Sequence, residues 1–203
     1  MMMNDMLKKY NNSSLKDTSK DNEEYMTNSE KIKVINFDNL SKKGYSKMLR
    51  LKGQSFPFKT NDALYLDVEN NKFIFIEFKN GSFSANEKKF KEKELPQLEL
   101  KIIGSMYILQ EITGKSFKEL REITDYILVY NKEKNPHIFS AVDMGNYIVN
   151  LGTLNNKKIT NPKEGISFGL EKFKGYCFKN VHTYSKEEFE EKFVKKIENE
   201  NIV

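Results

Sequence analysis

Residues 62–81 read DALYLDVENNKFIFIEFKNG, and this stretch decides how the chain is expected to fold. Two runs within it, 62–69 and 72–79, are rich in the aromatic and β-branched residues that are typical of strands. Asn70 and Asn71 separate the runs, and asparagine tolerates the positive φ angles of a tight hairpin turn. The stretch therefore predicts an antiparallel hairpin with a two-residue turn.

A two-residue turn would pair position 69 with 72 and, at the open end of the hairpin, position 62 with 79. Directly paired residues share a face of the sheet, and side chains alternate between the two faces along each strand. In this register one face carries a row of apolar side chains, and at the open end of the hairpin the same face carries Asp62, Glu77 and Lys79. Charges at the end of a strand that reads Phe-Ile-Phe-Ile mark either a solvated strand end or a functional site.

These three residue types have a chemistry in common. Two carboxylates that lie close together repel each other and need a cation, and oxygen ligands suit Mg²⁺ or Mn²⁺ better than zinc. A lysine beside them can position a water or stabilise charge on a phosphate. Asp62, Glu77 and Lys79 therefore predict metal-assisted hydrolysis of phosphodiesters. The structural alternative is that Lys79 pairs with Asp62 across the strands, and that Glu77 is a solvated charge.

The remainder of the chain alternates between helical and extended patterns. Apolar residues at helical spacing and a capping-box pattern predict the helices, and short runs of β-branched and aromatic residues predict the strands. The expected elements are helices that begin near Asp38 and span 97–113 and about 116–123, strands at 125–132, 137–144 and 175–184, a helix at 145–152, and a last helix that begins at Ser185 with Glu188. This order predicts an α/β domain with a mixed sheet flanked by helices.

Length and composition limit the possible organisation. A chain of 203 residues fits a single domain, assigned to residues 29–203. Residues 1–28 are polar with few aliphatic side chains, so we expect a flexible tail there. The single cysteine excludes a disulfide framework and a cysteine zinc cluster, and this fits a cytoplasmic protein.

Charge and hydropathy bear on the partners. The sequence contains neither an apolar run long enough to cross a membrane nor the apolar core of a secretory signal, so we expect no membrane partner. The net charge of +5 favours a polyanionic partner, although a lysine-rich composition alone also produces such a charge.

The hairpin and its charges resemble the PD-(D/E)XK nuclease superfamily, which includes the restriction-endonuclease-like and Holliday-junction-resolvase-like folds. That family has an αβββαβ core with an Asp at the start of one central strand and Glu-X-Lys on the next. Asp62 in TNDALYL matches the first motif, and Glu77-Phe78-Lys79 in IFIEFKNG matches the second. The resemblance covers about residues 38–132. It implies that Asp62, Glu77 and the backbone carbonyl of Phe78 hold Mg²⁺ or Mn²⁺, and that Lys79 positions the hydrolytic water.

The chain departs from the family pattern in two places. Asn61 stands where the family has a proline. Many members also carry an acidic residue on the first helix, for which Glu30 and Asp38 are the available matches, so a second metal site is not implied.

Further residues are candidates for contacts with the substrate. Some family members have a glutamine or lysine on the helix after the second motif, and Gln97 and Lys101 match because they lie one helical turn apart. Lys88 and Lys89 follow the motif and can neutralise phosphates, but the glutamates among them fit a solvated helical face equally well.

The sequence thus favours a magnesium-dependent endonuclease that acts on nucleic acid, with DNA favoured over RNA. Two alternatives stay open. One is a catalytically inactive binding or regulatory protein that keeps the nuclease fold. The other is a toxin or phage-defence nuclease that acts with a partner protein. A homodimer is compatible with each of these hypotheses.

Overall fold

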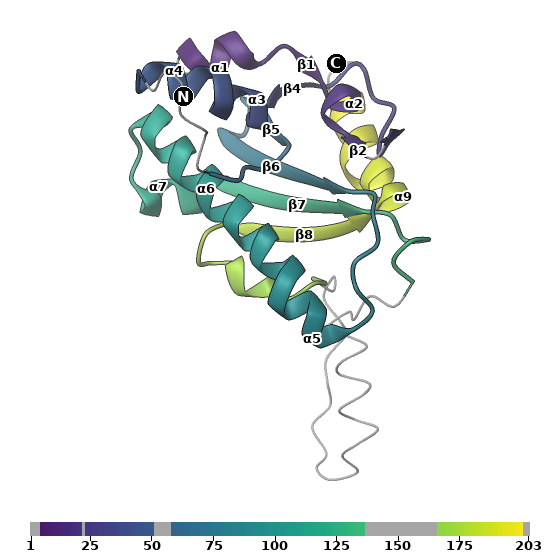
Figure 1. The fold of residues 1–203 in the computed structure, drawn as a ribbon. Coiled ribbons are helices and arrows are strands. Elements are labelled where there is room, and N and C mark those ends of the chain that lie inside the picture. Colours follow the sequence, from purple (N-terminus) through teal and green to yellow (C-terminus); the bar gives the residue numbers. More distant parts are fainter. Residues whose placement is uncertain (1–4, 22, 51–57, 137–165, 201–203) are drawn as a thin grey trace, which may run out of the picture.

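The computed structural model describes residues 5–21, 23–50, 58–136 and 166–200. In these residues a six-stranded sheet has the order β1-β4-β5-β6-β7-β8, and helices lie on both of its faces (Figure 1). Within this order β1, β4, β5 and β6 pair antiparallel with one another, whereas β6, β7 and β8 are parallel. The predicted mixed α/β sheet is therefore confirmed. The strands are β1 (Ser13–Ser14), β4 (Lys33–Asn36), β5 (Ala63–Asp67), β6 (Lys72–Lys79), β7 (Thr124–Tyr130) and β8 (Asn180–Ser185).

Several helical segments join into longer helices. Residues 37–48, 87–113 and 186–200 each form one continuous helical stretch in which a π-helical segment links α-helical ones. The α-helices are α1 (Asp5–Tyr10), α2 (Leu15–Thr18), α3 (Phe37–Asn39), α4 (Ser46–Met48), α5 (Glu87–Lys89), α6 (Leu95–Thr113), α7 (Phe117–Ile123), α9 (Lys186–Phe189) and α10 (Lys195–Glu200). The π-helical segments are η1 (Leu40–Tyr45), η2 (Phe90–Glu94) and η4 (Glu190–Val194), and a 3-10 turn forms η3 (Glu171–Phe173).

The hairpin between β5 and β6 has a longer turn than the sequence predicts. Asp67 pairs with Lys72, so four residues rather than two connect the strands, and the predicted pairing of 69 with 72 is wrong. The reason is local: Asn70 donates its backbone N–H to Asp67 Oδ1 at 3.0 Å, while Asn71 has a φ of 53°.

A shift of two residues leaves every side chain on its predicted face, because the period of a strand is two. Leu64 and Leu66 indeed lie opposite Phe75 and Phe73 in one core. The shift also brings Asp62 level with Glu77 rather than with Lys79, since Ala63 pairs with Ile76.

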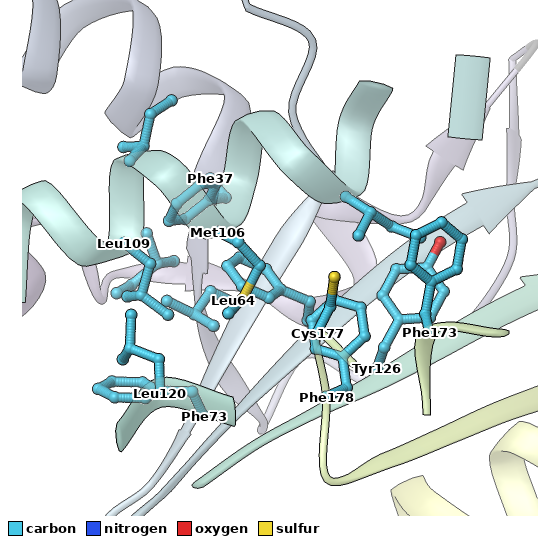
Figure 2. Close-up of a cluster of buried hydrophobic side chains, with 14 of the residues drawn as sticks. Phe37, Leu64, Phe73, Met106, Leu109, Leu120, Tyr126, Phe173, Cys177 and Phe178 are labelled. Atoms are coloured by element: carbon cyan, nitrogen blue, oxygen red, sulfur yellow. The ribbon is translucent and has the colours of Figure 1, made fainter. Parts of the chain in front are cut away.

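Two hydrophobic cores cover the two faces of the sheet. On one face α6 and α7 pack against Leu64, Phe75 and Tyr126, and Figure 2 shows part of this cluster around Met106. On the other face the C-terminal helical stretch buries Phe189 and packs it edge-on against Phe78. The sheet is therefore buried on both sides, as expected of an α/β domain.

Helix α6 is long and well delimited. Pro96 occupies its first turn, and Gly114, with a φ of 65°, ends it by donating its N–H to the Gln110 carbonyl. The predicted apolar stripe of this helix is buried in the core, and it consists of Leu98, Ile102, Met106, Leu109 and Ile112. The helix connects β6 to the parallel strand β7, which fixes its position across the face of the sheet.

The N-terminal segment differs from the flexible tail that the sequence analysis expects. Residues 5–21 and 23–28 contribute α1, β1, α2 and a small separate sheet of β2 (Lys20–Asp21) and β3 (Glu24–Tyr25). Leu7, Leu15 and Met26 are buried. The physical reason is that these few apolar side chains join cores that the rest of the domain builds, so the segment needs no core of its own.

Most other predicted elements are present with shifted ends. The helix that begins near Asp38 ends at Met48, and the last strand begins at Asn180 because a turn at Gly175, with a φ of 74°, precedes it. The capping box of Ser185 and Glu188 is confirmed. The elements predicted over 137–152 lie outside the described residues. Among the described helices, none has the length and apolar character needed to cross a membrane.

Candidate functional site

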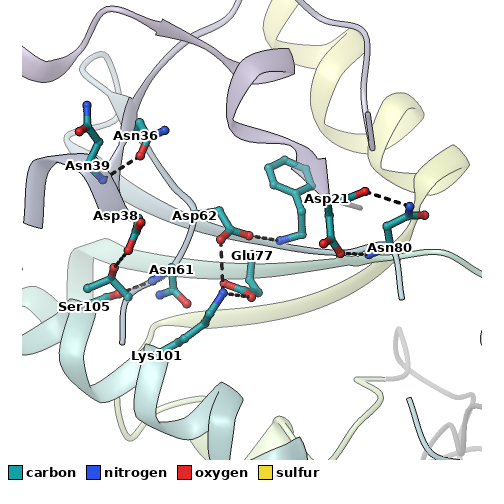
Figure 3. A network of polar contacts seen from close by, with 12 residues as sticks. Asp21, Asn36, Asp38, Asn39, Asn61, Asp62, Glu77, Asn80, Lys101 and Ser105 are labelled. Atoms are coloured by element: carbon teal, nitrogen blue, oxygen red, sulfur yellow. Dashed lines mark hydrogen bonds and ion pairs between the residues drawn. The ribbon is translucent and has the colours of Figure 1, made fainter. Parts of the chain in front are cut away.

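Asp62 and Glu77 meet where β5 begins beside β6 (Figure 3). Asp62 Oδ2 accepts a hydrogen bond of 2.8 Å from the backbone N–H of Phe78, and the Asp62 carbonyl accepts one from the Phe37 N–H. Glu77 lies in the interior of the sheet, since β6 pairs with β5 on one side and with β7 on the other. The backbone of the sheet thus positions both residues, and it also bonds the Asp62 carboxylate directly.

Helix α6 supplies a cation to this pair. Lys101 Nζ lies 2.5 Å from Glu77 Oε1 and 3.3 Å from Asp62 Oδ1. The ammonium therefore bonds both carboxylates, and the alternative in which Lys79 pairs with Asp62 across the strands is wrong. Lys101 had been predicted only as a possible substrate contact.

Burial controls the electrostatics of the site. Glu77 is 3% exposed, and its desolvation, together with repulsion by Asp62, raises its pKa to about 8. Desolvation also raises the pKa of Asp62, although Lys101 and the Phe78 N–H act in the opposite direction. Burial lowers the pKa of Lys101, but the two carboxylates raise it more, so this lysine is charged. The site consequently holds two carboxyl groups for which one ammonium is the neighbouring counter-ion.

Lys79 lies on the same face of β6 as Glu77, two residues further along the strand. Its Nζ is 5.5 Å from the centre of the Phe83 ring, a cation–π contact that orients the side chain. It forms no ion pair with another described residue, and its charge lowers the pKa of Glu77 as a minor effect. Glu77 and Lys79 therefore share one face of the sheet, as the sequence predicts.

The oxygen atoms at this site fit a hard divalent cation. Glu77 Oε2 is buried and accepts no hydrogen bond from the described residues. The N–H of Phe78 points towards Asp62, and the C=O of a strand residue points to the same side as its N–H, so this carbonyl faces the site as well. No three acidic, histidine or cysteine side chains in the described ranges form a metal cluster by themselves. The set therefore fits Mg²⁺ or Mn²⁺, which bind through one or two carboxylates and keep several waters.

The other residues predicted to contact the substrate lie on α6 and α5. Gln97 is one turn before Lys101 on α6, and its Oε1 accepts a hydrogen bond from Lys59 Nζ. Lys88 and Lys89 are exposed on α5, where Lys88 pairs with Glu92 at 3.9 Å. This pairing at i,i+4 matches a solvated helical face.

The two candidates for a first-helix acid lie in separate places. Asp38, labelled in Figure 3, accepts from Thr60 Oγ1 at 3.1 Å through Oδ1. Its other oxygen pairs with Lys42. Glu30 is exposed and pairs with Lys16 at 2.6 Å. Neither bonds to Asp62 or Glu77 in the described part of the chain.

Three neighbours of the site were not predicted. Asp21 in β2 accepts from the Asn80 N–H at 2.8 Å, and its charge contributes to the raised pKa of Asp62. Asn61 is fully buried, and Tyr126 on β7 has a buried hydroxyl. The departure from proline at Asn61 was visible in the sequence, whereas Asp21 and Tyr126 reach the site only through the sheet topology.

Comparisons with protein-family models, with curated proteins and with solved structures find no match for this chain. Its function is therefore inferred from the geometry of the site.

Proposed function

We propose that this chain is a divalent-metal-dependent hydrolase of phosphodiesters. The observation that supports this proposal is the pairing of Asp62 and Glu77 on neighbouring strands, with their carboxylates sharing the Lys101 ammonium. Two adjacent carboxyl groups, the partly exposed Asp62 and the buried Glu77, that already share one cation offer the oxygen ligands that a divalent cation prefers. Within this class we propose a nuclease of the PD-(D/E)XK type, with DNA favoured over RNA as the substrate.

The proposal extends to the fold. Strands β4, β5 and β6 are successive antiparallel neighbours, and α6 leads from β6 to the parallel strand β7. This arrangement supports the αβββαβ core of the superfamily. A difference is that β4 precedes the helical stretch 37–48, whereas the αβββαβ order of the superfamily has its first core helix before all the strands.

The residues divide the work as follows. Asp62, Glu77 and the Phe78 carbonyl would hold the cation, and the Phe78 N–H fixes the orientation of Asp62. When bound, Mg²⁺ or Mn²⁺ supplies a Lewis acid that lowers the pKa of water and offsets charge on the phosphodiester. Lys79 donates a hydrogen bond that orients the attacking water, because its ammonium lies on the Glu77 face and forms no ion pair with a described residue.

Lys101 and Gln97 complete the proposed site on the side of α6. Lys101, which bonds both carboxylates in the absence of a cation, would be released from them if Asp62 and Glu77 held one, and would then pair with a phosphate oxygen of the substrate. Gln97, one turn earlier on the helix, faces the same substrate side.

A second candidate function rests on the same lysine. Because Lys101 already bonds both carboxylates, the pair is neutralised without a metal, as in a binding or regulatory protein that has lost catalysis. This candidate predicts that neither Mg²⁺ nor Mn²⁺ binds.

The decisive experiment is calorimetric titration of the full chain with Mn²⁺, followed by cleavage assays with plasmid DNA, linear duplex, single-stranded DNA and RNA. We expect Mn²⁺ to bind to the wild type and not to Glu77→Gln, and DNA to be cut only by the wild type. Absence of Mn²⁺ binding by the folded wild type would favour the regulatory candidate. Binding without cleavage of any substrate would refute the nuclease assignment.

A further inference from the structure

Asn61 lies directly against the helix that reaches the carboxylate pair. Its backbone N–H donates to Ser105 Oγ at 2.8 Å. Ser105 follows Lys101 by one helical turn on α6, so the two side chains lie on one face of that helix. The residue after Asn61 is Asp62, which bonds Lys101. Asn61 is therefore fixed beside the centre of the site by its own backbone and by α6 (Figure 3).

The carboxamide of Asn61 is buried, and it bonds to no residue in the described part of the chain. The residue is 0% exposed, and neither Oδ1 nor Nδ2 forms a hydrogen bond with any described residue. A carboxamide offers two N–H donors and an acceptor oxygen, and leaving them unpaired in the interior is unfavourable. Since buried polar groups in native proteins are nearly always bonded, a further partner for this amide, an ordered water or a ligand, is expected.

Residues in and next to the site account for most of the unpaired buried atoms. Seven buried side-chain nitrogen and oxygen atoms in the described residues lack a hydrogen-bond partner, and four of them belong to Asn61, Glu77 and Tyr126. Tyr126 and Glu77 lie on the same face of the sheet, because Tyr126 pairs with Phe75. Desolvation and the negative charges of Glu77 and Asp62 raise the pKa of Tyr126 well above its ordinary value, which places its hydroxyl within their field.

We infer that Asn61 is a further ligand residue of the divalent-cation site, and that its Oδ1 binds the same cation as Asp62 and Glu77. The inference rests on the proposed function. A cation is the expected ligand rather than an anion, because Asp62 and Glu77 next to Asn61 offer carboxyl oxygens that a cation binds and, once ionised, repel an anion. A neutral carboxamide oxygen adds a hard ligand without adding a third negative charge to this pair.

The test combines metal affinity with stability of the cation-free protein. Asn61→Leu replaces the unpaired amide with an apolar group of the same branching, so its melting temperature without cation should equal or exceed that of the wild type. Its Mn²⁺ affinity should fall by about 10- to 100-fold, the range seen when groups that support a metal are removed. Asn61→Asp, which keeps the size and adds charge, should bind Mn²⁺ more tightly than the wild type.

Asn131→Leu is the matched control. Asn131 is also buried, but its Nδ2 donates to Asn80 Oδ1 and its Oδ1 accepts from the Lys134 N–H. This variant should lower the melting temperature and leave Mn²⁺ affinity unchanged.

The outcomes separate the inference from the proposed function. If the wild type binds Mn²⁺ and both Asn61 variants bind it with unchanged affinity, the inference is overturned and the proposed function stands. If the folded wild type binds no Mn²⁺, the proposed cation site fails and the inference fails with it. If Asn61→Leu does not fold, Asn61→Asp decides, since unchanged or weaker binding by that variant also overturns the inference.

Discussion

Two polar clusters lie near β6, and they differ in how completely their buried atoms are paired. The site cluster comprises Asn61, Asp62, Glu77, Lys101 and Tyr126, and it contains four buried atoms without a partner among the described residues. The asparagine cluster comprises Asn80, Asn131 and Asn135, and none of its buried amide atoms is unpaired. A paired network holds the fold together, whereas an unpaired one carries a cost that a ligand can remove.

The asparagine cluster joins three parts of the chain. Asn80 Nδ2 donates to Glu24 Oε2 at 2.9 Å and to the Asp21 carbonyl at 3.1 Å. Its Oδ1 accepts from Asn131 Nδ2 at 2.9 Å. Asn135 continues the network by accepting from the Phe83 N–H. These bonds attach the small β2–β3 sheet to the end of β6, so the role of the cluster is structural.

The largest effect is expected at Lys79, which follows Glu77 on the site face. Lys79→Ala should lower the rate of DNA cleavage by about 10²- to 10⁴-fold, because it removes the group proposed to orient the attacking water. Mn²⁺ affinity should stay constant or rise, since a positive charge near the carboxylates is lost. Cleavage of a labelled duplex and calorimetry measure the two quantities.

Two further variants sharpen this test. Lys79→Arg should fold and bind Mn²⁺ but cleave poorly, because the planar guanidinium does not reproduce the compact ammonium. Lys72→Ala, at the opposite end of the same strand, is the control and should cleave normally. Full activity of Lys79→Ala would contradict the assignment of the site.

A large loss of stability is expected in the asparagine cluster. Asn80→Leu removes partners of Glu24, Asp21 and Asn131 at once, so the free energy of unfolding should fall by about 3 kcal/mol. Urea unfolding followed by circular dichroism measures the change. Asn61→Leu, a buried asparagine of the site cluster, is the comparison and should lose no stability. Equal losses in the two variants would remove the distinction between the clusters.

Sequence reasoning located the carboxylates because their faces depend only on strand parity. Asp62 and Glu77 stay on one face whether the turn has two or four residues. The register itself was not predictable from the Asn70-Asn71 pair, because the Asp67 side chain bonds to the turn and ends the pairing early.

Contacts that depend on the tertiary arrangement could not be predicted from the sequence. The spacing of Gln97 and Lys101 placed them on one helical face, but the bonds of Lys101 to two carboxylates follow from how α6 crosses the sheet. The sequence predicts a flexible tail for the N-terminal segment, because its few apolar residues form no core alone. Leu7 and Leu15 are buried because other elements supply their cores.

A moderate effect on metal affinity is expected at Lys101. Lys101→Met keeps the aliphatic packing and removes the ammonium that competes with the cation, so Mn²⁺ should bind about tenfold more tightly. Without cation the same variant should melt at a lower temperature, because Glu77 and Asp62 lose their counter-ion, and Mn²⁺ should restore the melting temperature.

Lys172→Met is a suitable control for that experiment. Lys172 pairs with Glu99 on α6, the helix that carries Lys101, and it bonds neither Asp62 nor Glu77. It should leave Mn²⁺ affinity unchanged. Unchanged affinity in Lys101→Met as well would show that the ammonium does not compete with the cation.

The most gradual effect is the pH dependence of stability in the cation-free protein. The pKa of Glu77 is about 8 in the folded state against an ordinary value of 4.5, so the folded state retains a proton that the unfolded chain releases. The stabilisation is therefore fully present below pH 4.5 and is lost as the pH rises through about 8. The free energy of unfolding should fall by at most about 1.4 kcal/mol per pH unit in this window.

Urea unfolding at about pH 6 and about pH 8 measures this slope. Glu77→Gln has no proton to release at this position and should flatten the slope, leaving the part that the raised pKa of Asp62 contributes. Saturating Mn²⁺ should reverse its sign, because metal ligands bind best when deprotonated and the bound state then gains affinity with pH. A slope in Glu77→Gln as steep as in the wild type would mean that Glu77 is ionised in the folded protein. The two clusters would then differ in their hydrogen bonding, but not in a proton that the folded protein retains on Glu77.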